Sequence, residues 1–334
     1  MKKLFTLIMV IVSVFVASCS NDAVPIEYHT ATTFKVNLNN IVDIPNIYEI
    51  NAGELEGVSS GYKLRVRLLV YNSDGALVAS ETEHFSSYND IMSTTVTLEE
   101  GLYTAVAITD IIKGSFSYWT LSEENSITYA RVTDNGYIGG QNKFLGVGAR
   151  TFNLSGTTKE VIIDPSLAGA VLLTLWRNVN AYNNVNTMTL ESNRMSKYLE
   201  FSGSGSIGYV LDNDNNNFKW RVNYIERADF PDSKNVYAYC FAFPGKNISY
   251  KYSLETSDIG ILETDTFTMN LEAGYEYYFC LNLKDPDQGD EVTHTAYKIG
   301  GTKSSPVIPE IEESVPAEST MSLMELIKLT DKTE

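Results

Sequence analysis

Apolar residues recur at every second position in many short segments of this chain. In the clearest case, residues 63–70, apolar positions alternate with lysine, arginine and one further leucine, and they are Leu64, Val66, Leu68 and Val70. A period of two places these side chains on one face of an extended strand, so the pattern predicts strands with one buried face. No segment in the first half has a convincing helical period, and the pattern therefore predicts an all-β protein of short strands.

Further runs with this spacing divide the chain into a series of predicted strands. In the first half they lie at residues 32–38, 63–70, 76–80, 94–98, 102–109, 143–154 and 159–163. In the second half they lie at residues 169–176, 236–243, 249–254, 266–271 and 275–283. Between two of them, Asn72-Ser73-Asp74-Gly75 has residue types that tolerate the backbone angles of a tight reversal, so we expect a hairpin there.

Two pairs of matching segments indicate an internal repeat. Residues 97–103 read TLEEGLY and residues 270–276 read NLEAGYE, so Leu-Glu-x-Gly occurs in both segments. At the same spacing of 173 residues, Leu68-Leu69-Val70 at the end of one strand is matched by Phe241-Ala242-Phe243. Two matches at one spacing predict two domains of similar topology.

The sequence divides into five predicted regions. Residues 1–18 form a signal peptide, residues 19–61 a polar segment with the first strand, and residues 62–164 the first β-domain, which includes the strand near 32–38. Residues 165–300 form the second β-domain, and residues 301–334 form a tail rich in Pro and Glu. The boundary is placed at Asp164-Pro165, because proline removes an amide donor and restricts the residue before it. The apolar stretch at 321–329 fits either a short amphipathic helix or a frayed end.

The N-terminus has the features of an export signal. Lys2 and Lys3 precede an apolar run that is too short for a stable membrane span. Val16-Ala17-Ser18-Cys19 then places small residues before a cysteine and closely resembles the bacterial lipobox. We expect Cys19 to take a diacylglycerol and to become the first residue of the mature protein. The alternatives are an ordinary signal peptide cut near the same place and a signal anchor that is never cut.

The composition limits the classes of partner. The formal net charge is −17, from 25 Lys and Arg against 42 Asp and Glu. Nucleic-acid binding needs a clustered cationic surface, so we predict no nucleic-acid partner. Anionic lipids would not attract this chain either, and the acyl group on Cys19 is expected to supply most of the membrane attachment.

Two cysteines remain once Cys19 carries lipid, and an exported protein meets an oxidising compartment. In the register of the repeat, Cys240 and Cys280 lie on the same side of a sheet, so they would meet if their strands were neighbours. A disulfide between them, two buried thiols and an exposed pair are all compatible with the sequence.

Patterns typical of catalysis or metal binding are weak. His29, His84 and His294 lie in three distant segments with no companion ligand at metal-binding spacing. No nucleophile elbow, zinc-protease, P-loop or dinucleotide motif occurs, so we predict no enzyme, no cofactor and no metal site. The oxygen-rich stretches at 212–217 and 285–290 are predicted to be solvated turns, and the first lacks the glycine and the glutamate of an EF-hand. A looser calcium site at either stretch is the alternative.

Aromatic residues have two possible uses in this chain. The sequence has 21 tyrosines, and Trp119, Trp176 and Trp220 would suit flat platforms for sugar rings. The repeat nevertheless aligns residues 237, 239, 241 and 243 with the inward positions 64, 66, 68 and 70. We therefore expect most of Tyr237, Tyr239, Phe241 and Phe243 to lie in a core.

The lipobox, the polar segment after it and two further motifs together resemble one known family. Residues 67–75 (RLLVYNSDG) and 98–107 (LEEGLYTAVA) are similar to segments of the fimbrillin superfamily, the type V pilus subunits and anchors of Bacteroidota. The resemblance spans roughly residues 28–300. It implies two tandem transthyretin-like Greek-key β-sandwich domains, and it indicates a fold more firmly than a role.

The resemblance also implies a mode of assembly. Structural subunits of the family are lipoproteins that an arginine-specific protease cuts in the N-terminal segment, which opens a groove for a neighbour's donor strand. Between Cys19 and Leu64 this chain has Lys35 and Lys63 but no arginine. We therefore expect the chain to keep its lipid and its first strand, as anchor or terminating members do. Prolines 306, 309 and 316 would interrupt a donated strand in the tail.

Together these features predict a lipoprotein of the outer membrane, exposed at the cell surface, that acts as an anchor-like or accessory pilus subunit. Its partners would be other pilus subunits, through a donor strand or a face contact. The alternative from another class is a surface glycan-binding lipoprotein, and two or three exposed aromatic residues at one loop end would distinguish it.

Overall fold

The structure is a computed structural model that describes residues 29–38, 62–85, 91–135, 143, 145–156, 160–179, 185–211, 220–226, 228, 235–257, 260–264, 266–283 and 292–301. Every regular element that it describes is a β-strand, so the predicted all-β class is confirmed. The signal peptide with Cys19, the oxygen-rich stretches at 212–217 and 285–290, and the tail after Gly301 lie outside the described residues.

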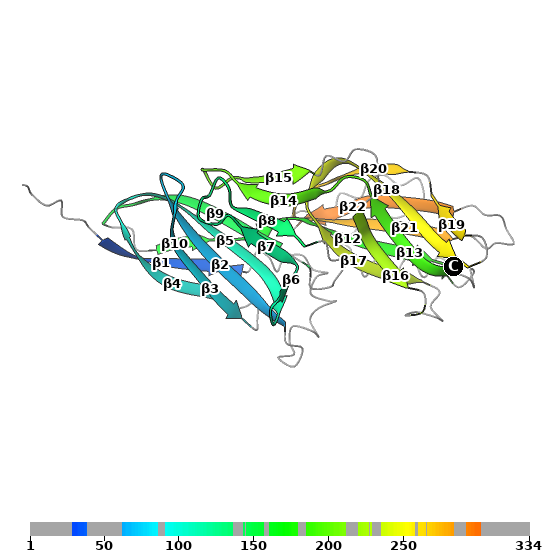
Figure 1. Cartoon of the computed structure of the whole chain (residues 1–334), viewed down its shortest axis with the longest axis horizontal. Helices are drawn as coiled ribbons and strands as arrows, with labels where there is room; N and C mark the ends of the chain where they lie inside the picture. The colour runs from blue at the N-terminus through cyan, green and yellow to red at the C-terminus, as the bar shows by residue number, and fades with distance from the viewer. Residues whose placement is uncertain are drawn as a thin grey trace, which may run out of the picture.

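The first sandwich has two sheets around one core (Figure 1). The β1 sheet has the order β10-β1-β4, with strands Glu160–Ile163, His29–Asn37 and Ile91–Glu99. The β2 sheet has the order β11-β9-β5-β2-β3, with strands Ser166–Leu167, Leu145–Leu154, Gly101–Lys113, Tyr62–Asn72 and Leu77–Phe85, and β6 (Phe116–Ser117) pairs with β5. The predicted inward residues of β2 are all buried, as expected, and they are Leu64, Val66, Leu68 and Val70. Leu69 and Tyr71, on the other face, are buried as well.

The hairpin between β2 and β3 forms at the predicted turn. The side-chain oxygen of Asn72 accepts hydrogen bonds from the backbone N–H groups of Asp74 (3.1 Å) and Ala76 (2.9 Å). Gly75 has φ +78°, a left-handed conformation that side chains disfavour. The asparagine cap and the glycine therefore fix the reversal.

The second sandwich has two further sheets around a separate core. The β12 sheet has the order β17-β12-β21-β22, with strands Val236–Ala242, Ala170–Arg177, Tyr275–Leu283 and Val292–Gly301. The β13 sheet has the order β16-β13-β18-β19, with strands Trp220–Glu226, Val185–Ser192, Gly245–Thr256 and Gly260–Glu263, and β20 (Phe267–Leu271) pairs with β18. Large aromatic side chains fill this core, including Trp176, Tyr250, Tyr252 and Phe279.

Both copies of Leu-Glu-x-Gly mark the place where the chain passes from one sheet of a sandwich to the other. The first copy joins β4 to β5, and the second joins β20 to β21. A tyrosine hydroxyl holds each crossing: Tyr103 donates to the carbonyl of Glu99 (3.0 Å), and Tyr277 accepts from the backbone N–H of Glu272 (2.9 Å). The repeated motif therefore has a repeated structural role.

The repeat does not extend to the strands before these crossings. β2 and β5 are neighbours, whereas β12 lies between β17 and β21. The predicted register of β17 is also wrong, because Val236, Cys240 and Ala242 face the core of the second sandwich. Phe241 and Phe243 are buried, as expected of core residues, but they belong to the core of the first sandwich. A shift by one residue moves every side chain of a strand to the other face.

A fifth sheet, the shared sheet, joins the two halves of the chain. Its order is β15-β14-β8-β7, with strands Ile207–Leu211, Ser196–Phe201, Arg131–Asp134 and Trp119–Ser122. Side chains from both halves, Trp119, Val132, Leu199 and Phe201, belong to the core of the first sandwich. The shared sheet therefore ties the second half of the sequence to the first sandwich (Figure 1).

The connection between the sandwiches runs through residues 164–170. β11 still pairs with β9 after the predicted boundary at Asp164-Pro165, and the N–H of Ala168 donates to the carbonyl of Leu145 (2.9 Å). At Gly169 an added Cβ would lie 2.5 Å from the carbonyl oxygen of Ala242. The chain thus leaves the first sandwich only after Ala168, through a position where the backbone needs the space of a glycine.

Candidate functional site

The first strand, β1, lies in the middle of its sheet. It pairs along its whole length with β4 in antiparallel register, from His29 opposite Glu99 to Asn37 opposite Ile91. On its other side it pairs with β10 in parallel register, from Thr33 to Val36. One edge of β1 is therefore paired along its whole length within this chain, and the other edge is paired over residues 33–36.

The inward side chains of β1 fill the core of the first sandwich. Thr32, Phe34, Val36 and Leu38 are fully buried. On the outer face, Thr33 makes a hydrogen bond with Thr95 (3.1 Å), and the half-exposed Lys35 pairs with Glu160 (2.6 Å). Without β1, the sheet would expose two unpaired strand edges beside an apolar trough. β1 is also the first described strand after Cys19, only ten positions along the chain.

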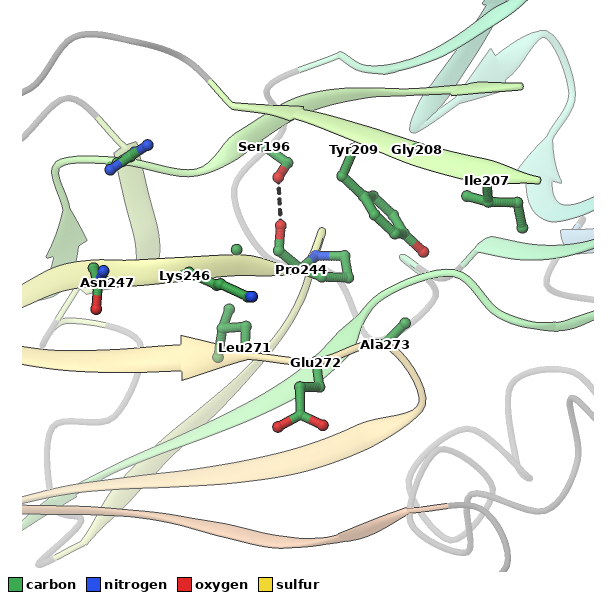
Figure 2. A pocket seen from close by; sticks show the side chains of 12 residues that line it. Ser196, Ile207, Gly208, Tyr209, Pro244, Lys246, Asn247, Leu271, Glu272 and Ala273 are labelled. Atoms are coloured by element: carbon green, nitrogen blue, oxygen red, sulfur yellow. Dashed lines mark hydrogen bonds between the residues drawn. The ribbon is translucent and has the colours of Figure 1, made fainter. Parts of the chain in front are cut away.

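A pocket of about 600 Å³ opens beside the second Leu-Glu-x-Gly crossing. Its walls come from β15, the start of β14, the connection from β17 to β18 and the turn from β20 to β21. Ile207, Pro244 and Leu271 give it an apolar lining. Figure 2 shows Tyr209 reaching toward the pocket from β15, opposite Leu271.

Polar groups line parts of the same pocket. The hydroxyl of Ser196 donates a hydrogen bond to the carbonyl of Pro244, which joins the shared sheet to the second sandwich. Burial raises the pKa of Tyr209 to about 12, and its ring lies 5.9 Å from that of Phe243. Lys246 is exposed at the rim, and Arg194 has a buried Nε that makes no hydrogen bond with the described residues.

A cluster of buried charges lies on the outer face of the β2 sheet, beneath the residues that lead into β7. Asp110 is fully buried and accepts two hydrogen bonds from Arg65 (2.9 and 2.6 Å) and one from the Ser117 hydroxyl (2.8 Å). Burial lowers the pKa of Arg67, an effect that the charge of Asp110, 4.0 Å away, opposes. With every oxygen of Asp110 occupied by neighbours, this cluster joins strands and offers no open site.

The two cysteines of the second domain do not form a disulfide with each other. Cys240 lies opposite Leu172 of β12, and Cys280 lies opposite Leu175 on the other side of the same strand. Two strand spacings across the sheet and three residues along β12 separate their Cα atoms by roughly 14 Å, beyond the reach of a disulfide. Leu172 and Leu175 face opposite sides of the sheet, so the predicted common side is wrong. Both thiols are buried, which was one of the alternatives that the sequence left open.

The three histidines lie on separate strands, His29 on β1, His84 on β3 and His294 on β22. Within the described residues no group of three or more His, Cys, Asp and Glu could hold a metal ion. The same residues include no helix long and apolar enough to cross a bilayer.

The described aromatic residues form no exposed platform. Trp119 and Trp176 are buried, and Trp220 packs against the core of the second sandwich. Trp119 contacts Phe241 and Phe243, with ring centroids 5.6 and 5.0 Å apart, at the junction of the two sandwiches. Among the exposed large apolar side chains whose exposure the structure describes, Tyr129 is the aromatic one. The sequence missed this junction because periodicity does not report contacts between domains.

Comparisons with known proteins complete the description. No family model matches the sequence, and no curated protein matches it. Among solved structures, the fimbrial anchor protein Mfa2 from Porphyromonas gingivalis is 9% identical, with 80% of this chain and 97% of that chain covered and a TM-score of 0.43. The C-terminally truncated tip fimbrial protein Mfa3 from the same organism is 12% identical, with 80% and 99% covered and a TM-score of 0.43. A candidate adhesin from Bacteroides thetaiotaomicron is 12% identical, with 81% and 96% covered and a TM-score of 0.48. Similarity at this level assigns no role to the chain.

Proposed function

We propose that this chain is a lipid-anchored surface protein of the outer membrane that serves as an anchor-like or accessory subunit of a pilus. Cys19 carries the lipid, the two sandwiches stand on that tether, and other pilus subunits are the partners. The role requires no catalysis, no cofactor and no metal.

The observation that carries the proposal is the position of β1. This strand lies between β4 and β10 and buries its apolar face in the first core. A subunit that gives up its first strand to receive a donor strand must be cleaved before β2. The expected protease cuts after arginine, and the segment between Cys19 and Leu64 has no arginine. Retention of β1 keeps the fold continuous with the lipid at Cys19, which supports an anchor role.

Partner subunits would then bind at sheet edges that remain open. β3, at one end of the β2 sheet, and β22, at one end of the β12 sheet, each have a single neighbouring strand among the described residues. An open edge presents N–H and C=O groups to an incoming strand. We propose that strand addition at such an edge, or a contact between faces, joins this subunit to the pilus.

The decisive experiment isolates the protein from outer membranes and determines its N-terminus and intact mass. We expect a first residue at Cys19 with an acyl modification, and a mass that includes β1. A mature protein that begins after Asn37 would overturn the anchor role. Cys19→Ala is the matched variant, and it should release the protein from the membrane without changing the fold of residues 29–301.

A glycan-binding role would need a cluster of exposed aromatic side chains at one end of a sandwich. Among the side chains whose exposure the structure describes, Tyr129 is the one large aromatic side chain that is exposed. No observation favours this alternative, and we do not propose it.

A further inference from the structure

The pocket beside the second Leu-Glu-x-Gly crossing lies close to the point where the C-terminal tail begins. β22 ends at Gly301, which pairs with Tyr275 at the start of β21. Ala273, which lines the pocket, is two residues before Tyr275. Two Cα steps and one strand pairing place Gly301 within about 13 Å of Ala273. The chain therefore leaves the second sandwich next to the pocket.

The pocket has the chemistry of a site for an apolar segment that follows an acidic stretch. Ile207, Pro244 and Leu271 give it apolar walls, and a volume of about 600 Å³ is enough for several aliphatic side chains. Arg194 and Lys246 supply positive charge at its border. The one acidic side chain of the lining, Glu272, is exposed, and Figure 2 shows it directed away from Tyr209.

The tail of this chain has the complementary composition. Residues 321–329 read MSLMELIKL, with six aliphatic or methionine side chains in nine positions. Within this segment Glu325 and Lys328 balance each other, and the negative charge of the tail comes from four glutamates before it, at positions 310, 312, 313 and 318. The nineteen residues from 302 to 320 would reach about 25 Å as a flexible coil and about 60 Å if extended. Either reach exceeds the separation between Gly301 and the pocket.

We propose that residues 321–329 of the same chain occupy this pocket. The short tether raises the local concentration of the segment to the millimolar range, so modest affinity is enough for occupancy. Apolar side chains of the segment cover Ile207 and Leu271, and its one carboxylate, that of Glu325, lies near Arg194 and Lys246. This inference is independent of the pilus role, since it concerns only the chain's own tail.

Disulfide trapping in the full mature chain tests the proposal. One variant combines Ala273→Cys with Leu326→Cys, and its matched control combines Ala31→Cys with Leu326→Cys. Ala31 is exposed on β1, at the far end of the molecule from β20 (Figure 1). Because Cys240 and Cys280 are buried, the new thiols are the ones that an added oxidant reaches first. We expect the pocket pair to form an intramolecular link on the order of tenfold faster than the control pair.

Two outcomes would overturn the proposal. Equal rates in the two variants would show that the tail does not reside at the pocket. Disulfide-linked dimers that form as fast as the monomeric link would assign the occupant to a second copy. Lys246→Glu in the trapping variant should slow the link several-fold, and an unchanged near-ultraviolet circular dichroism spectrum would show that the fold is intact.

A second measurement uses a labelled peptide of residues 319–332. We expect it to bind a chain that ends at Thr320, and to bind the full chain at least tenfold more weakly, because the tethered tail competes. Equal binding to both chains, or binding to neither, contradicts the proposal. The described fold ends at Gly301, so the shortened chain keeps every described strand.

Discussion

Asp110 is a single residue whose carboxylate charge is expected to contribute strongly to stability. It is fully buried, and Arg65 and Ser117 donate three hydrogen bonds to its carboxylate. Asp110→Asn removes the charge and leaves the guanidinium groups of Arg65 and Arg67 without an anion in a buried place. Breaking one partner of a buried pair costs about 3–5 kcal/mol, so we expect a loss of stability of that size in urea unfolding.

Lys35→Ala provides the matched control for this charge. Lys35 pairs with Glu160 across the outer face of the β1 sheet, where both side chains are about 40% exposed (42% and 43%). Exposed pairs contribute at most about 1 kcal/mol. If Asp110→Asn lowers the free energy of unfolding by no more than Lys35→Ala does, the buried cluster around Asp110 does not stabilise the fold and the prediction is wrong.

The buried hydroxyl of Tyr209 should make the free energy of unfolding depend on pH in the alkaline range. Burial raises its pKa in the folded chain from 10.0 to about 12. Between those values the unfolded chain has lost the phenolic proton while the folded chain still holds it, so ionisation favours unfolding. Stability should be full below pH 10 and should fall as the pH rises toward 12. Tyr209→Phe should make this fall shallower in urea midpoints measured at pH 9 and pH 11.5, and an identical fall in both proteins would contradict the prediction.

The sequence pattern predicted which residues of β2 face the core, but it did not predict that the residues on the other face are also largely buried. Leu64 and Val66 were predicted by period alone, because a half-buried strand requires that period. Arg65 and Arg67 alternate with them as solvent-facing residues would. In the structure Arg65 donates a hydrogen bond to Ser117 of β6 (3.0 Å), and the buried Asp110 compensates the charge of both arginines. What covers the second face of a sheet depends on distant segments, which periodicity cannot report.

At the scale of elements, the strands with clean alternation were predicted within a few residues. The predicted strand at 275–283 coincides with β21, and that at 236–243 with β17, Val236–Ala242. No periodic pattern predicted β13, β14, β15 and β16, which lie among segments rich in Asn, Ser and Gly. There the hydrogen bonds of sheet pairing outweigh weak local propensity. The pocket lies between missed elements and the crossing motif, so it could not have been found from the sequence.

The first strand allows a direct test of complementation. A chain that starts at Tyr62 lacks β1 and leaves β4 and β10 with unpaired edges beside the space of Phe34. We expect this chain to aggregate or to lose cooperative unfolding, because a buried Phe alone is worth about 3–5 kcal/mol. A synthetic peptide of residues 28–39, present during refolding, should restore a soluble monomer with a cooperative transition.

The control peptide carries Phe34→Asp and Val36→Asp, which place charges in the core. It should fail to restore folding, while a Lys35→Ala peptide should succeed, since Lys35 lies on the outer face. If the shortened chain unfolds cooperatively with the stability of the parent chain and no peptide, β1 is dispensable and the strand cannot carry the anchor argument.

At the scale of the whole molecule, the shared sheet decides whether the two sandwiches behave as one unit. β14 follows β13 of the second sandwich, yet it pairs with β8 and places Leu199 and Phe201 in the core of the first. Phe241 and Phe243 of β17 reach the same core and contact Trp119. The first sandwich therefore cannot open fully without releasing side chains that belong to the second half of the chain.

This arrangement predicts a single unfolding transition for both sandwiches. Hydrogen exchange of β5 amides reports on the first core and that of β21 amides on the second, and in increasing urea both should converge on one opening free energy. Phe201→Ala, although it lies in the second half of the sequence, should speed exchange in β5, since truncating a buried Phe costs about 3–5 kcal/mol. Ile261→Ala truncates an exposed side chain and is the matched control, so it should change the exchange of neither the β5 nor the β21 amides. Separate transitions for β5 and β21, or an effect of Phe201→Ala confined to β21, would mean that the shared sheet is only a loose contact and that force on a tethered chain could open one sandwich alone.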